Sequence, residues 1–162
     1  MADQAGFRAL LDVAQAEAAT RSSATVAAEH LLLALLSDQD RTAARILSPQ
    51  GLTHEAFSTA LDRERDHTLA RIGLSIPDPT RLAAAPRAFT GHPRLSASAK
   101  EAWDRGSRLT PGRRERTQPP SDLTLLVGIL SAELGTVPRA LIRGGLDRTE
   151  LLSAAQTALH NL

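Results

Sequence analysis

The chain has no cysteine among its 162 residues. Disulfides, thiol catalysis and zinc–thiolate sites are therefore excluded, and the absence fits a cytosolic protein. Long apolar runs are also missing, because the longest, Leu31–Leu36, is far too short to cross a bilayer. The first residues, MADQAGF, lack the basic and apolar regions of a secretory signal. We therefore expect a cytoplasmic protein that does not act at a membrane.

Motifs for catalysis and for cofactor binding are missing as well. The chain has no G-x-x-x-x-G-K-[ST] loop for nucleotide phosphates and no G-x-S-x-G nucleophile motif. Its five histidines are scattered and never show H-E-x-x-H spacing, so no metal site is expected. The carboxylates form no obvious pair for acid–base chemistry. The sequence predicts a protein without enzymatic activity, cofactor or metal.

Alanine and leucine are abundant, with 28 and 26 residues, whereas valine and isoleucine together number only 9. Alanine and leucine favour helices, and β-branched residues favour strands. This balance predicts an all-α fold.

A stretch near the N-terminus is repeated 94 residues later in the chain. EHLLLALLSDQDRTAARILSPQGL starts at Glu29, and LTLLVGILSAELGTVPRALIRGGL starts at Leu123. Ten of the 31 residues from position 30 to position 60 are identical in the second copy. An internal repeat of this length sets the architecture, so the chain is expected to fold as two related halves.

Each copy shows the pattern helix, turn, helix, glycine, helix. Gly51 and Gly145 stand where a helix end needs a left-handed residue. Thr53 and Asp147 follow them, and each is predicted to cap the next helix. The first helix of each pattern has apolar residues on one predicted face. In the two copies these residues are Leu32, Leu35 and Leu36, and Leu126, Ile129 and Leu130.

The repeat also predicts the domain organisation. We expect a single domain over residues 1–162, with repeat one at 3–72, a linker at 73–94 and repeat two at 95–162. A further helix precedes each copy, over residues 10–18 and 102–110. Four prolines make the linker irregular, with at most a short helix over residues 80–85. Two pseudo-symmetric four-helix units should then pack together, because neither buries its apolar faces easily alone.

The repeated pattern resembles the Clp repeat in the N-terminal domains of Clp-type AAA+ unfoldases. The residues that carry the resemblance are EHLLLALL from Glu29, the following AARIL and GL, and GHPRLSASAK from Gly91. The resemblance covers nearly the whole chain and implies two four-helix Clp repeats packed into one all-α domain. Because the nucleotide-binding loop is missing, it implies a free-standing Clp N-domain-like protein without the ATPase motor.

The resemblance implies a function and partners too. It implies a non-enzymatic protein- and peptide-binding module that acts as an adaptor, competitor or decoy in Clp-dependent proteolysis. The expected partners are Clp unfoldase and protease components, adaptors and client proteins. Phosphoarginine and cyclic-peptide antibiotics are the small ligands that the resemblance suggests.

Five residues are candidate ligand-binding residues by this resemblance. Glu29 is implied to bind cationic or phosphorylated arginine groups, and a carboxylate facing a guanidinium can form a bidentate pair. His92, Leu95, Lys100 and Asp104 are implied to receive adaptors and cyclic peptides. Glu29 has the alternative role of stabilising a helix N-terminus, and His92 that of ending a linker. Lys100 and Asp104 have the alternative of a solvated pair one helical turn apart.

The second copy departs from the family pattern. Leu123 and Thr124 replace the Glu-His pair of the first copy, so a ligand site is expected to survive in copy one only. Pro138 stands in a helix that is usually uninterrupted in the family. Trp103, the only tryptophan, aligns with Leu11 of copy one and is expected in the core.

Five arginines between Arg105 and Arg116 give an alternative function. Contact between this loop and nucleic acid phosphates would make the protein a nucleic-acid-associated regulator. The loop has no interleaved aromatic residues, and the sequence favours a solvated loop or, after that, contact with an acidic partner protein.

Overall fold

The computed structural model describes residues 2–74, 94–109 and 119–161. These residues form eight α-helices and one short 3₁₀ helix, with no strand among them. The all-α prediction is therefore confirmed. The short helix predicted over residues 80–85 lies outside the described residues.

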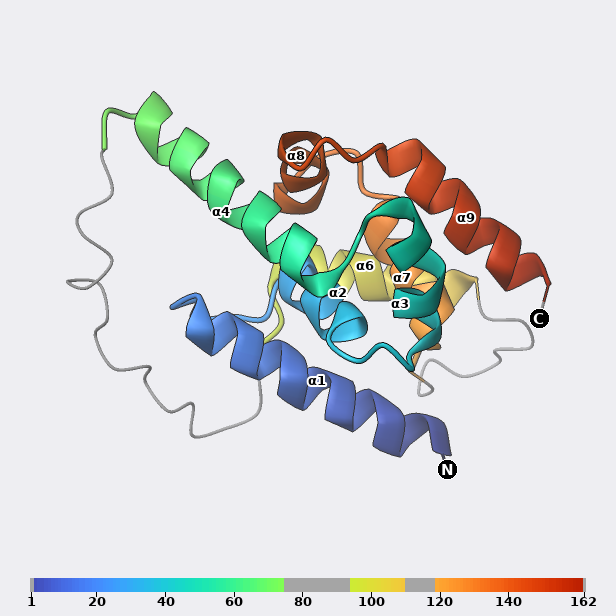
Figure 1. The fold of residues 1–162 in the computed structure, drawn as a ribbon. Coiled ribbons are helices and arrows are strands. Elements are labelled where there is room, and N and C mark those ends of the chain that lie inside the picture. Colours follow the sequence, from blue (N-terminus) through green and yellow to red (C-terminus); the bar gives the residue numbers. More distant parts are fainter. Residues whose placement is uncertain (1, 75–93, 110–118, 162) are drawn as a thin grey trace.

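The helices follow the order of the two sequence copies (Figure 1). The first copy contains α1 (Ala2–Thr20), α2 (Ala28–Leu36), α3 (Thr42–Leu47), η1 (Ser48–Gln50) and α4 (His54–Arg71). The second copy contains α6 (Ala97–Arg108), α7 (Asp122–Leu130), α8 (Thr136–Arg143) and α9 (Arg148–His160). None of the helices in the described ranges is long and apolar enough to cross a membrane.

The helix ends predicted from the two glycines and the two capping residues are confirmed, whereas the first helix of each copy begins earlier than predicted, at Ala2 and at Ala97. Gly51 and Gly145 have φ angles of 83° and 70°, the left-handed region that favours glycine. Thr53 accepts a hydrogen bond from an amide in the first turn of α4, and Asp147 accepts from two amides at the start of α9. Pro138 does not interrupt α8, because it is the third residue of that helix. Amides in a first helical turn have no intrahelical partner to lose.

The helices α2 and α7 form the centre of the molecule. Every residue of α2 except Glu29 is buried, and so is every residue of α7 except Asp122. The sequence predicted one buried face on each helix, and this underestimated how much of each helix is buried. The reason is that α2 and α7 contact each other and are also covered by other helices: α1 packs on α2, α6 packs on α7, and α3 contacts both.

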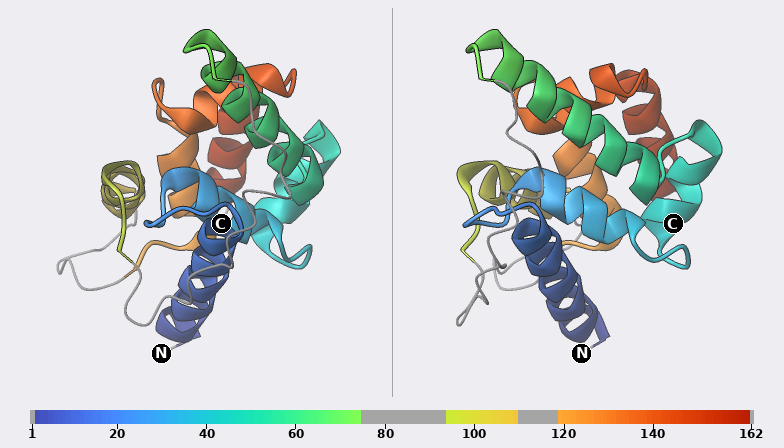
Figure 2. Two further views of the ribbon diagram at one scale, coloured as in Figure 1. Left: turned by 90° about the vertical axis from the view of Figure 1, so that its left-hand side faces the viewer. Right: turned by 60° about the vertical axis from the view of Figure 1, so that its left-hand side comes forward.

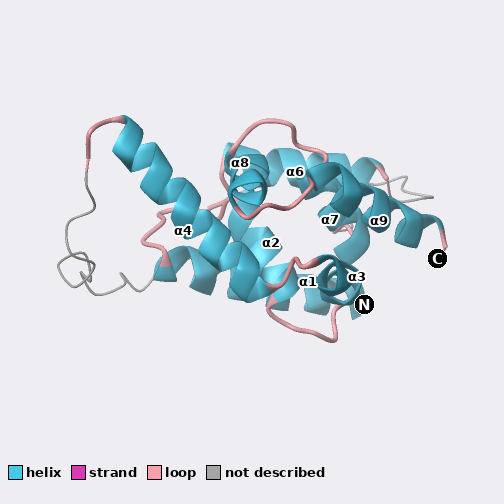
Figure 3. Ribbon diagram, turned by 45° about the horizontal axis from the view of Figure 1, so that its top comes forward, coloured by secondary structure: helices cyan, strands magenta, loops and turns pink. Residues whose placement is uncertain are grey.

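The two copies pack reciprocally around this centre. The fourth helix of copy one, α4, packs against α8 of copy two, and the fourth helix of copy two, α9, packs against α3 of copy one (Figure 3). Each copy therefore covers apolar surface of the other. Figure 2 shows α1 and the C-terminal end of α4 at opposite ends of the molecule.

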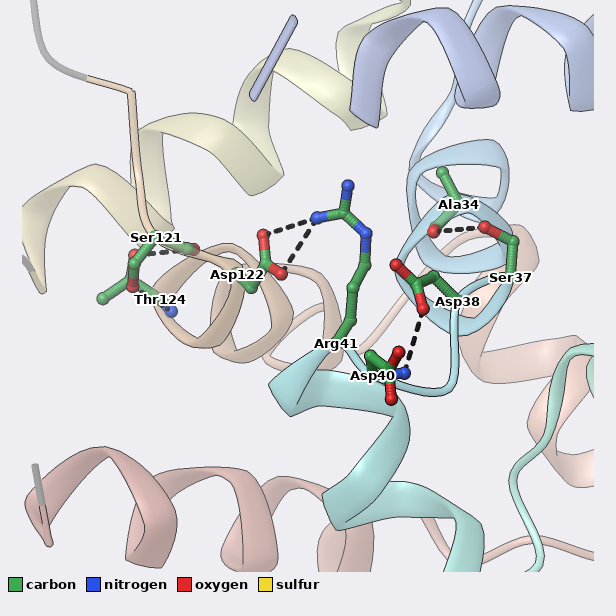
Figure 4. A network of polar contacts seen from close by, with 8 residues as sticks. All are labelled: Ala34, Ser37, Asp38, Asp40, Arg41, Ser121, Asp122 and Thr124. Carbon is green, nitrogen blue, oxygen red and sulfur yellow. Dashed lines mark hydrogen bonds and ion pairs between the residues drawn. The ribbon is translucent and has the colours of Figure 1, made fainter. Parts of the chain in front are cut away.

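An ion pair also joins the copies near the start of α3 and α7. Nη1 of Arg41 lies 3.1 and 3.0 Å from the two carboxylate oxygens of Asp122 (Figure 4). Asp122 is the first residue of α7, where a negative charge also interacts favourably with the helix dipole. The side chain of Arg41 is only 18% exposed, so this contact is better shielded from solvent than a surface ion pair.

Candidate functional site

Two chain segments from different copies run side by side just before α2 and α6. The amide of Val26 donates to the carbonyl of Arg94 at 2.8 Å, and the amide of Ser96 donates to the carbonyl of Val26 at 2.9 Å. These bonds make an isolated parallel bridge between Val26 and Leu95. We call residues 26–30 and 94–98 the repeat junction. The bridge brings the N-termini of α2 and α6 together.

Serine side chains complete the contacts at the repeat junction. The amide of Ala28 donates to Oγ of Ser98 at 3.2 Å, which links the start of α2 to the start of α6. Ser96 caps α6 by accepting from the amide of Ala99, and its Oγ lies 3.0 Å from that of Ser98. Sequence reasoning missed Ser98, because its partner lies 70 residues away and no local spacing indicates the contact.

Glu29 lies in the first turn of α2 and is half-buried. Burial is the largest influence on its carboxyl group and raises its pKa above the ordinary value. A hydrogen bond to its own backbone and the positive charges of Arg21 and Arg139 act in the opposite direction, but they do not outweigh burial. Glu29 is therefore a carboxylate with poor solvation that sits near two arginines.

Arg21, which sequence reasoning also missed, is held by α4. One guanidinium nitrogen lies 2.8 Å from Oδ1 of Asp62, and the other donates to Oγ of Ser58 at 2.7 Å. These contacts fix the positive charge of Arg21 close to Glu29 and His30, since it affects the pKa of both.

His30 has a structural role in the EHLLLALL element. Its Nδ1 accepts a hydrogen bond at 2.9 Å from the amide of Ala27, the residue before α2. This contact satisfies an amide at the helix start, as the third-position residue does in a capping box. Burial, helped by the charge of Arg21, lowers the pKa of His30 to about 4, although Glu17 acts to raise it. His30 is therefore neutral at pH 7.

The structure brings together only part of the predicted site. Glu29 and Leu95 both belong to the repeat junction. Lys100 and Asp104 lie further along α6, and both are exposed. These two described residues stand one helical turn apart and form no direct ion pair, and their role stays a prediction. His92 lies outside the described residues.

Trp103 was expected in the core from its alignment with Leu11, but it is not fully buried. It is half-buried on α6, and its ring packs edge-to-face against Phe7 of α1, with centroids 4.5 Å apart. This contact joins the first helices of the two copies.

The second copy lacks the equivalent carboxylate. Leu123 stands in the place of Glu29 and is buried in the core. Thr124 stands in the place of His30, and here Ser121 caps α7 by accepting from the amide of Thr124. The start of α7 is thus capped in a different way and presents no equivalent of Glu29.

The arginine loop is described only in part, because residues 110–118 lie outside the described ranges. Nε of Arg105 donates to the carbonyl of Gly128 at 2.8 Å, so this guanidinium is already engaged with α7. A role of the remaining arginines in nucleic acid contact stays a prediction. Within the described ranges, no group of histidines and carboxylates is arranged to hold a metal ion.

The fold and the repeat junction define a duplicated all-α domain in which each copy covers the other. The family model for the Clp repeat (R) N-terminal domain matches residues 5–107, and the chain belongs to this family. The resemblance found in the sequence is therefore confirmed. Membership of the family makes the chain a Clp-related protein-interaction module.

A solved structure supports the fold independently. The chain is similar to the N-terminal domain of the caseinolytic protease associated chaperone ClpD from Arabidopsis thaliana, with a TM-score of 0.61 and 20% sequence identity. The similarity covers 94% of this chain and 90% of that chain. A comparison with curated protein sequences gave no match.

Proposed function

We propose that the chain is a non-enzymatic module of the Clp system that binds arginine-phosphorylated client segments at the repeat junction. In this role it acts as an adaptor, competitor or decoy in Clp-dependent proteolysis. The observation that carries the proposal is the half-buried Glu29 beside the paired starts of α2 and α6. A carboxylate with poor solvation gains most from a guanidinium partner that supplies two N–H donors.

The charges around Glu29 favour phosphoarginine over a plain cation. The positive charges of Arg21 and Arg139 act on Glu29, and a simple cationic ligand would meet their repulsion. A phosphorylated guanidinium carries donors for Glu29 and a negative group for the arginines. The proposed contact surface for cyclic peptides and adaptors consists of His92, Leu95 and the exposed Lys100 and Asp104 of α6.

Glu29→Gln is expected to weaken phosphoarginine binding at least tenfold, because a charge-assisted contact contributes roughly 1.5–3 kcal/mol. Isothermal titration calorimetry on the purified chain measures this directly. The matched control is Glu55→Gln, which changes an exposed glutamate at the same position in the first turn of α4. Unaltered affinity in Glu29→Gln, or an equal loss in both variants, would contradict the proposal.

The same substitution is expected to leave stability at pH 7 unchanged or increased. Because the pKa of Glu29 is raised in the folded state, the folded chain binds the proton more tightly than the unfolded chain does. This carboxyl group therefore lowers the free energy of unfolding as pH rises through the range above its ordinary pKa. Thermal unfolding at pH 7 checks the sign, and a clear fall in Tm for Glu29→Gln would show that the carboxylate is mainly a structural group.

A further inference from the structure

A groove of about 580 Å³ lies between α4 of the first copy and α8 of the second. Four of its lining residues are cationic or imidazole side chains: His67, Arg71, Arg139 and Arg143. We call it the α4–α8 groove. The arrangement of its charges and apolar side chains indicates the kind of ligand it can bind.

A single buried carboxylate positions two arginines in the α4–α8 groove. Nε of Arg139 lies 2.6 Å from Oε1 of Glu64, and Nε of Arg143 lies 3.6 Å from Oε2. The side chain of Glu64 is only 6% exposed, whereas those of Arg139 and Arg143 are 56% and 41% exposed. One carboxylate thus holds two guanidinium groups by their inner nitrogens. Nη2 of Arg143 also lies 2.8 Å from Nε2 of His67.

The balance of charge in the groove is positive. Burial would raise the pKa of Glu64, but its hydrogen bonds from Arg139 and Thr68 and the charges of both arginines hold that pKa below its ordinary value. Glu64 is therefore ionised at neutral pH. Its negative charge offsets the positive charge of one of the two arginines that it contacts. Arg71, at the end of α4, adds an exposed positive charge with no ion pair among the described residues.

Apolar side chains stand next to these charges. Ile72 is 66% exposed and Ile142 is 71% exposed, and both line the groove. Large exposed aliphatic residues beside a charged site indicate a surface that a partner covers. A small inorganic anion would leave both isoleucines uncovered.

The pseudo-symmetric groove beside α9 lacks this combination. It is lined by Gln50, by Asn161 and by residues of α9 that are small or polar apart from one glutamate, Glu150. The sequence offset places Pro49 at the position of Arg143, Ser48 at that of Ile142 and Ala158 at that of Glu64. Arg139 has an arginine counterpart in Arg45. Arg143, Ile142 and the buried Glu64 have no equivalent in the other copy, so this combination is not required by the fold.

We propose that the α4–α8 groove binds a peptide segment of a partner protein in which carboxylates alternate with aliphatic side chains. The carboxylates pair with the outer nitrogens of Arg139 and with Nη1 of Arg143, since guanidinium groups bind carboxylates through charge-assisted hydrogen bonds. The aliphatic side chains cover Ile72 and Ile142. This second surface is centred on Glu64, Arg143 and the isoleucines and not on Glu29, although the charge of Arg139 acts at both places.

Fluorescence anisotropy with a labelled Leu-Glu-Ile-Glu-Leu peptide tests the proposal on the full chain. We expect Arg143→Ala and Ile142→Ser each to weaken binding about tenfold, which corresponds to roughly 1.4 kcal/mol. Arg45→Ala is the matched control, because Arg45 is an exposed arginine of α3 that does not line the groove. This substitution removes the same charge as Arg143→Ala does. Its affinity for the peptide should equal that of the unmodified chain.

Further measurements distinguish binding of an acidic peptide from binding of any apolar peptide and from binding of a small anion. Leu-Gln-Ile-Gln-Leu should bind at least tenfold more weakly, and inorganic phosphate at millimolar concentration should not displace the acidic peptide. No binding of the acidic peptide, equal binding of the two peptides, equal loss in Arg45→Ala and Arg143→Ala, or displacement by phosphate would each overturn the proposal. Glu29→Gln should leave peptide affinity unchanged and Arg143→Ala should leave phosphoarginine affinity unchanged, so that failure at one site is distinguishable from failure at the other.

Discussion

Gly128→Ala is expected to lower the free energy of unfolding by about 3 kcal/mol, near the upper end of the usual effect of overpacking. The close crossing of α6 and α7 leaves no space for a methyl group at this position. A Cβ atom would collide with the carbonyl oxygen of Ala102 and would lie 2.7 Å from the amide nitrogen of Gly106. Both neighbours are backbone atoms, so they cannot move aside by a change of side-chain rotamer.

Thermal and urea unfolding measure this effect, and for a chain of this size the expected fall in Tm is roughly 6–12 °C. Gly6→Ala is the matched control, since Gly6 lies exposed in α1 and a Cβ atom there meets nothing within 4 Å. That variant should gain about 0.5–1 kcal/mol from helix propensity. A Gly128→Ala chain as stable as the unmodified one would show that the two helices are not packed as closely as described.

Acidification from pH 6.5 to pH 4 is expected to remove on the order of 3 kcal/mol of stability through His30 alone, since one pKa unit corresponds to about 1.4 kcal/mol. Its pKa falls from 6.5 to about 4 in the folded chain because the imidazole is buried beside Arg21. The unfolded chain therefore binds the proton first as pH falls. The stability is fully present above pH 6.5 and is lost progressively down to the folded pKa.

The variant His30→Gln isolates this contribution. Glutamine at the third helical position can still accept from the amide of Ala27, so the cap is retained while the titrating group is removed. Urea unfolding at several pH values should show a steeper loss of stability in the unmodified chain than in His30→Gln, by roughly 1 kcal/mol per pH unit. Parallel pH profiles for the two proteins would mean that His30 does not titrate with folding.

The parts of the fold that depend on local sequence could be predicted. Gly51 and Gly145 mark helix ends because the backbone there needs a positive φ, and Thr53 and Asp147 cap helices through amides two or three residues away. These interactions lie within one turn of the chain. The repeat itself predicted two related halves, and the eight helices fall at equivalent positions in the two copies.

The parts that depend on contacts between the copies could not be predicted in the same way. Helical periodicity indicated one apolar face on α2, but every residue of α2 except Glu29 is buried, because α6, α7 and α8 of copy two cover the sides that copy one leaves open. The contact from Ala28 to Ser98 and the pair of Arg139 with Glu64 join residues that are 70 and 75 positions apart. No spacing within a single helix indicates such partners.

The two copies have kept the scaffold and diverged at their surfaces. The left-handed glycines Gly51 and Gly145 and the reciprocal packing occur in both copies, whereas buried Leu123 stands in copy two at the position of Glu29. The groove beside α8 carries the arginine pair and the isoleucines, and its counterpart beside α9 does not. A duplicated fold whose copies differ in these surface residues is well suited to bind two different partners.

The most direct test of the proposed function is a nuclear magnetic resonance titration of the full chain with phosphoarginine. If the repeat junction is the ligand site, the largest changes in backbone amide shifts will fall on residues 27–30 and 96–99, and Glu29→Gln will abolish them. Shift changes confined to the α4–α8 groove or to the arginines of residues 105–116, or no changes at all, would contradict the assignment of the site to Glu29.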